Sequence, residues 1–207
     1  MISTLIFDMG GVVFALSHEK AIRRFEEIGV ASARDLLNPY HQEGVFGQLE
    51  QGLISKEQFR RTLSESCGRV LTEGECRYAW MGFVDYIATA SLSYIRSLRE
   101  KGYRTLLLSN TNAFITEWGR SGEFDGQGNS MLRYFDRLYF SCECKLMKPS
   151  PEIFLHLLRS EGLRAGECIF VDDSKANIDA AASLGFRTLL APDALSWPEL
   201  LKASFSL

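Results

Sequence analysis

The chain has 207 residues, of which 46% are hydrophobic and 24% charged, a composition typical of a globular protein with a sizeable core. The net charge of −3 argues against a general nucleic-acid-binding surface, and no apolar run approaches the roughly 20 residues of a membrane span, so we expect neither kind of partner. The first residues have no basic segment of the kind that opens a signal peptide, and the five cysteines, an odd number without CxxC spacing, predict free thiols in a reducing cytoplasm.

Short apolar runs that end in small or acidic residues predict the buried strands of a parallel sheet. They span residues 4–7, 105–108, 168–171 and 186–191, with a further short strand expected at 138–140. Helix-period segments lie between them, at 91–101, from Ser150 onward and at 174–184. Strands that alternate with helices predict an α/β fold with right-handed crossovers.

Residues 15–90 interrupt this alternation and contain no clear strand. Ser55 with Gln58 and Thr72 with Glu75 fit the capping-box pattern that begins a helix. We therefore predict a Rossmann-like core, formed by residues 1–14 and 91–207, with a small helical module inserted at 15–90.

Polar side chains stand where the predicted strands end. Asp8, Ser109 and the pair Asp172 and Asp173 each follow such a strand, and Lys148 precedes a helix that starts nearby. In open α/β sheets ligands bind at the carboxyl edge, so these side chains should converge there. Three carboxylates, a hydroxyl and an ammonium group would suit a phosphate bridged to Mg²⁺, which prefers oxygen ligands.

Four segments stand out around these polar residues: Phe-Asp-Met-Gly-Gly-Val-Val at 7–13, Leu-Ser-Asn-Thr-Asn at 108–112, Lys-Pro at 148–149 with Pro-Glu-Ile-Phe at 151–154, and Val-Asp-Asp-Ser-Lys-Ala-Asn-Ile at 171–178. In this order they resemble the four motifs of the haloacid dehalogenase superfamily. Most members of this superfamily are Mg²⁺-dependent phosphohydrolases. The chain looks closest to the branch that contains bacterial α-D-glucose-1-phosphate phosphatase, and the module at 15–90 fits the helical (C1-type) cap.

The resemblance implies a role for each matching residue. Asp8 would be the nucleophile that attacks phosphorus and forms an aspartyl-phosphate, and Lys148 would neutralise the charge of the transferring group. The Met9 and Asn110 backbone N–H groups and the Ser109 hydroxyl would bind phosphate oxygens.

The same resemblance implies a Mg²⁺ site. The second carboxylate oxygen of Asp8 and the backbone carbonyl of Gly10 would face the ion, Asp173 would bind it directly, and Asp172 would act through a metal-bound water. The expected substrate is a small phosphorylated metabolite, with a sugar phosphate preferred.

Gly10 is the one departure from the phosphatase pattern of the superfamily. Phosphatases of the superfamily usually carry a second Asp two residues after the nucleophile, which protonates the leaving group and later activates water. Gly10 has no side chain for this task, and general acid–base help is typically worth about 10²–10⁴-fold in rate. His18 and His41 are near or within the predicted cap, and no pattern assigns either of them the role.

Two alternatives to a phosphatase follow from these residues. The first is a non-catalytic relative that binds a phosphometabolite or a protein, which Gly10 favours. The second is a 2-haloacid dehalogenase, which also uses an Asp nucleophile. Two adjacent carboxylates, Asp172 and Asp173, would repel an anionic haloacid, which makes the second alternative the weaker one.

Overall fold

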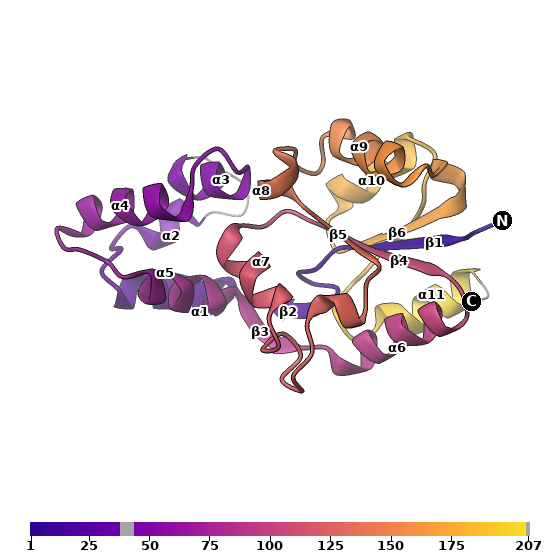
Figure 1. Ribbon diagram of the computed structural model, residues 1–207, viewed down its shortest axis with the longest axis horizontal. Coiled ribbons are helices and arrows are strands. Elements are labelled where there is room, and N and C mark those ends of the chain that lie inside the picture. The colour runs from indigo at the N-terminus through magenta and orange to yellow at the C-terminus, as the bar shows by residue number, and fades with distance from the viewer. Residues whose placement is uncertain (38–43, 206–207) are drawn as a thin grey trace.

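The structure is a computed structural model that describes residues 1–37 and 44–205. A parallel five-stranded sheet forms the centre of its core (Figure 1). From one edge to the other the strands are β5 (Arg137–Phe140), β4 (Arg104–Ser109), β1 (Thr4–Phe7), β6 (Cys168–Asp172) and β7 (Arg187–Leu190). Every strand predicted from the apolar runs is present, within one or two residues of its predicted ends.

Helices cover both faces of the sheet, because successive side chains of a buried strand point in opposite directions. Leu5 and Phe7 of β1 pack into the core shared with α6 (Thr89–Glu100) and α11 (Trp197–Phe205). Ile6 packs on the opposite face, against α9 (Pro151–Glu161) and α10 (Lys175–Ser183). Figure 1 shows the two helix pairs on either side of the strands. The predicted Rossmann-like α/β fold is confirmed.

A set of helices lies beside the sheet, at the opposite end of the molecule in Figure 1 from the two termini. It contains α1 (His18–Glu27), α2 (Ala33–Leu36), α3 (Gly44–Glu50), α4 (Lys56–Cys67) and α5 (Glu73–Trp80), followed by the 3₁₀ turn η1 (Met81–Phe83). The rings of Phe25, Phe46, Phe59 and Trp80 lie 5.0–5.8 Å apart and form its core. The capping boxes predicted at Ser55 and Thr72 are both present.

Two short antiparallel strands, β2 (Phe14–Leu16) and β3 (Val84–Ile87), connect these helices to the sheet. The sequence predicts no strand in this part of the chain. Its strands are three and four residues long, partly exposed and irregular between Ala15 and Leu16, so they carry no clear alternation of apolar and polar residues. They position the helices over the end of β1.

The segments that follow β4 and β5 approach these helices from the sheet side. They are α7 (Ala113–Arg120), the 3₁₀ turn η2 (Met131–Arg133) and α8 (Ser141–Cys144), with the 3₁₀ turn η3 (Ala165–Glu167) further along the chain. Cys142 and Cys144 have the two-residue spacing of side chains on one face of a strand, but they lie on α8, because the chain turns into this helix as soon as β5 ends. All five cysteines are free thiols. Among the described residues, no helix is long and apolar enough to span a bilayer.

Candidate active site

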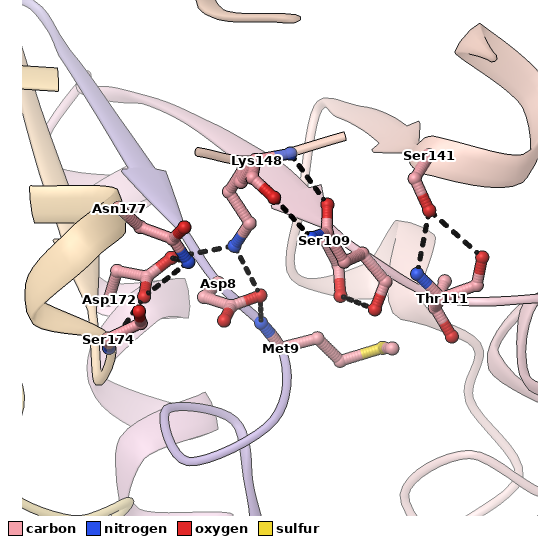
Figure 2. A network of polar contacts seen from close by, with 10 residues as sticks. Asp8, Met9, Ser109, Thr111, Ser141, Lys148, Asp172, Ser174 and Asn177 are labelled. Carbon is pink, nitrogen blue, oxygen red and sulfur yellow. Dashed lines mark hydrogen bonds and ion pairs between the residues drawn. The ribbon is translucent and has the colours of Figure 1, made fainter. Parts of the chain in front are cut away.

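The ammonium group of Lys148 lies between two carboxylates at the carboxyl edge of the sheet. Its Nζ atom donates to Asp8 Oδ1 at 2.8 Å and to Asp172 Oδ2 at 2.6 Å, as Figure 2 shows. Asp8 directly follows β1 and Asp172 ends the neighbouring strand β6, so parallel pairing brings the two side chains together. The side chains of Lys148 and Asp172 are 1% and 0% exposed, whereas that of Asp8 is 13% exposed and reaches the cavity.

Burial and neighbouring charges set the protonation of this cluster. Burial raises the pKa of Asp8 to about 7; Lys148 opposes this shift, while the negative charges of Asp172 and Asp173 add to it. Burial alone would lower the pKa of Lys148, but the two carboxylates outweigh it and hold the pKa above the usual value of lysine. Lys148 is therefore a permanent positive charge beside Asp8.

Asp172 and Asp173 are adjacent in sequence and differ in their surroundings. Asp172 Oδ1 accepts from the Ser174 backbone N–H at 2.8 Å and from Asn177 Nδ2 at 3.0 Å, in addition to the contact of Oδ2 with Lys148. Asp173 is exposed to the cavity, and partial burial of its carboxyl group together with the charge of Asp172 raises its pKa. Both oxygens of Asp172 therefore contact protein groups, whereas Asp173 faces the cavity.

Gly11 makes the close approach of Asp173 possible. Its φ of 71° lies in the left-handed region, and a Cβ at this position would stand 2.1 Å from Asp173 Oδ2. Any side chain at position 11 would displace the Asp173 carboxylate from the loop that follows β1.

Ligand oxygens of Asp8, Asp172 and Asp173 lie within 4.8 Å of one another and form a candidate metal centre. Lys148 is the cation that pairs with this cluster among the described residues, so the ionised cluster carries two negative charges in excess. A hard divalent cation such as Mg²⁺ matches both that charge and an all-oxygen donor set. The residues present therefore fit the metal that the sequence predicts.

Asn110 holds the backbone of Lys148 through both ends of its side-chain amide. Its Nδ2 group donates to the Lys148 carbonyl oxygen at 2.7 Å, and its Oδ1 atom accepts from the Lys148 backbone N–H at 2.9 Å. These bonds join the loop after β4 to the cis Lys148–Pro149 peptide, 38 residues further along the chain. The side chain of Asn110 therefore positions Lys148, a role that the motif pattern does not reveal.

We expect Asn110→Ala to lower the free energy of unfolding by about 1–3 kcal/mol, because two hydrogen bonds are lost and the Lys148 backbone groups lose their partner. Urea unfolding followed by circular dichroism would measure this change. An unaltered unfolding midpoint would show that solvent replaces the Asn110 amide without cost.

The remaining predicted site residues line a cavity of about 380 Å³ above the cluster. Ser109 is buried at the end of β4, with its hydroxyl 3.4 Å from the Asn110 carbonyl oxygen. Gly10 lies in the wall, and the Met9 backbone N–H donates to Asp8 Oδ1 at 2.7 Å, so it orients the carboxylate. His18 also lines the cavity, whereas His41 lies outside the described residues.

Glu50, the last residue of α3, also lines this cavity. Its backbone carbonyl accepts from Ser141 Oγ at 2.6 Å, and Ser141 Oγ accepts in turn from the Thr111 backbone N–H at 2.9 Å (Figure 2 shows Ser141 with Thr111). Sequence reasoning missed Glu50 because a single glutamate on an amphipathic helix has no pattern that separates it from solvated neighbours.

The parallel sheet has helices on both faces, and a buried lysine and three carboxylates lie at its carboxyl edge. These features are typical of an α/β enzyme with an acidic centre that can bind a metal ion. Comparison with known proteins narrows this class. The family model for haloacid dehalogenase-like hydrolases matches residues 2–185. The D-ribitol-5-phosphate phosphatase of Bacteroides thetaiotaomicron is 39% identical over 201 residues, which cover 97% of each protein.

Solved structures of the same family superpose closely on this chain. A hydrolase of Porphyromonas gingivalis has a TM-score of 0.92 at 37% identity, over 98% of this chain and 97% of that one. A Bacteroides thetaiotaomicron enzyme, solved with magnesium and inorganic phosphate, has a TM-score of 0.87 at 33% identity, over 97% and 99%. The chain therefore belongs to the haloacid dehalogenase-like hydrolases, as the four motifs predict. The more specific likeness to glucose-1-phosphate phosphatases stays a prediction.

Proposed function

We propose that this protein is a Mg²⁺-dependent phosphatase that hydrolyses a small phosphate monoester, with a sugar or sugar-alcohol phosphate as the preferred substrate. The observation that carries the proposal is the Asp8 carboxylate, paired with buried Lys148 and facing a cavity of metabolite size. A relative that covers 97% of the chain is named for a sugar-alcohol phosphate, which supports this substrate class.

Asp8 acts as the nucleophile in this proposal. Lys148 and the Met9 N–H fix the orientation of the Asp8 carboxylate, so that one oxygen attacks phosphorus to form an aspartyl-phosphate while the other faces the metal ion. Lys148 offsets negative charge that gathers on the transferring group, and the electrostatic contribution is large because the ammonium group is buried. Ser109 and the Asn110 backbone N–H bind the phosphate oxygens.

Asp8, Asp173 and the Gly10 carbonyl oxygen are proposed to hold Mg²⁺ directly. Asp172, whose oxygens already contact Lys148, Ser174 and Asn177, acts on the ion through water. When bound, the ion supplies positive charge that draws electron density from the phosphoryl oxygens. The helices between β2 and β3 are proposed to act as a cap at residues 15–90, which closes over the cavity and excludes water.

Phosphate release over a panel of sugar phosphates, sugar-alcohol phosphates and p-nitrophenyl phosphate tests the proposal. We expect turnover with Mg²⁺ and its loss in EDTA, because without the ion the carboxylate cluster repels an anionic substrate. Turnover should return when Mg²⁺ is added in excess of the chelator. Equal rates with and without EDTA would contradict the metal dependence.

The non-catalytic alternative stays a second candidate because Gly10 has no side chain that could exchange a proton with the leaving group or with water. Binding of Mg²⁺ and inorganic phosphate, measured by calorimetry, without turnover of any substrate on the panel would establish this alternative instead.

A further inference from the structure

The side chain of Leu16 borders position 10, two residues after Asp8. The nearest atoms to a Cβ built on Gly10 all belong to Leu16 of β2, at 2.9 to 3.1 Å. A phosphatase without an acid/base side chain at this position still has to protonate an alkoxide leaving group and to deprotonate water, and it keeps the rate gained from general acid–base catalysis only if another titratable group in the cavity takes over both tasks.

Four of the ionisable residues that line the cavity are poorly suited to transfer protons to the leaving group or from water. Asp8 and Asp173 belong to the candidate metal centre, and Lys148 is held between Asp8 and Asp172. His18 packs edge-on against Phe83, with ring centroids 5.3 Å apart, and burial lowers its pKa. His18 is therefore uncharged at neutral pH and has no readily donated proton.

Glu50 is the remaining ionisable side chain among the described residues that line the cavity. It is partly buried, and within residues 1–37 and 44–205 its carboxyl group has no ion-pair or hydrogen-bond partner. Burial raises the pKa of Glu50 to about 7, so both protonation states are populated near neutrality. A group poised in this way can both donate and accept a proton.

Contacts with segments that follow the strands of the sheet hold the backbone of Glu50 in place. Ser141 Oγ contacts both the Glu50 carbonyl oxygen and the Thr111 backbone, which belongs to the loop after β4. Two residues beyond Glu50, Gly52 approaches α8 so closely that a Cβ would stand 1.9 Å from the Cys142 carbonyl oxygen. The end of α3 is thus held against the core at the cavity wall.

We propose that Glu50 is the general acid and base of the reaction, supplied by a helix outside the sheet in place of a side chain at position 10. The inference rests on the phosphatase function proposed above. In the first step Asp8 attacks phosphorus, the bond to the ester oxygen breaks, and the leaving oxygen takes the proton of the Glu50 carboxylic acid. In the second step the Glu50 carboxylate removes a proton from water, whose oxygen attacks the aspartyl-phosphate. The bond between phosphorus and Asp8 breaks, which releases inorganic phosphate and restores both carboxyl groups.

Glu50→Gln tests this assignment, because the amide keeps the shape of the side chain and removes its titration. On an alkyl phosphate such as ribitol 5-phosphate we expect kcat to fall by about 10²–10⁴-fold. p-Nitrophenolate leaves without a proton, so p-nitrophenyl phosphate should still phosphorylate Asp8. The variant should release one equivalent of nitrophenolate per active site in a fast burst, then turn over slowly because water is no longer activated.

Two further variants complete the experiment. Glu65→Gln makes the same chemical change at an exposed position of α4 and should keep the wild-type rate on both substrates. Glu50→Asp keeps a carboxyl group and should be faster than Glu50→Gln on the alkyl ester. A purely structural role of Glu50 predicts that Asp and Gln lower the rates on both substrates alike and without a burst, and that outcome would overturn the proposal.

The outcomes separate this inference from the proposed function. A wild-type enzyme that turns over both substrates, together with an equally active Glu50→Gln variant, refutes the role of Glu50 and leaves the phosphatase intact. A wild-type protein that releases phosphate from no substrate refutes both.

Discussion

Asp8→Asn should abolish phosphate release, with kcat reduced by at least about 10⁴-fold, while the protein keeps its fold. The neutral amide cannot attack phosphorus, so no aspartyl-phosphate forms and the remaining contacts have no covalent step to assist. The amide oxygen can still accept from Lys148 and from the Met9 backbone N–H, which are the two partners of Asp8 Oδ1. The burial that raises the pKa of Asp8 also means that a neutral group is tolerated at this position.

Steady-state kinetics on the best substrate of the panel, together with a thermal unfolding curve, would measure both parts of this prediction. Asp35→Asn is the matched control, since Asp35 is exposed on α2, away from the cavity, and the same substitution there should change neither rate nor unfolding temperature. An Asp8→Asn protein with a tenth or more of the wild-type activity would rule out Asp8 as the nucleophile.

The central strands could be predicted from the sequence because each is a short apolar run with a sharp end. Thr4–Phe7 of β1 is fully buried and stops at Asp8, so hydrophobicity and chain direction both point to the correct edge of the sheet. The same reasoning placed Asp172 and Asp173 at the carboxyl end of β6. Because parallel strands share one carboxyl edge, the meeting of these carboxylates follows from topology alone.

Contacts between distant segments could not be predicted in this way. The Asn110 amide contacts Lys148 across 38 residues, and the Glu50 carbonyl contacts Ser141 across 91. Neither pair has a local pattern, because each depends on how two loops meet after the sheet and the helices have packed. Strands β2 and β3 escaped prediction for a related reason, since each is stabilised by its partner rather than by an apolar run of its own.

Lys148→Met should both inactivate and destabilise the protein. Methionine fills a similar volume but leaves Asp172 buried without its counter-ion and Asp8 without its only ion pair among the described residues. Breaking a buried pair by removing one partner typically costs about 3–5 kcal/mol, so the free energy of unfolding should fall by this amount. Lys148 lowers the pKa of Asp8, and its loss should raise that pKa above about 7, which protonates the nucleophile at neutral pH.

The rise in unfolding temperature on adding Mg²⁺ should distinguish the electrostatic role of Lys148 from its role in packing. At a pH above the raised pKa of Asp8, where Asp8, Asp172 and Asp173 are all ionised, the cluster without the lysine has one more uncompensated negative charge. Added Mg²⁺ should therefore raise the unfolding temperature of Lys148→Met more than that of the wild type, because a ligand that binds only the folded state stabilises it in proportion to its affinity. Lys101→Met, at an exposed position after α6, should respond to Mg²⁺ as the wild type does. An equal Mg²⁺ response in all three proteins would mean that Lys148 stabilises the site by its hydrocarbon chain, and that its charge is dispensable for holding the carboxylates together.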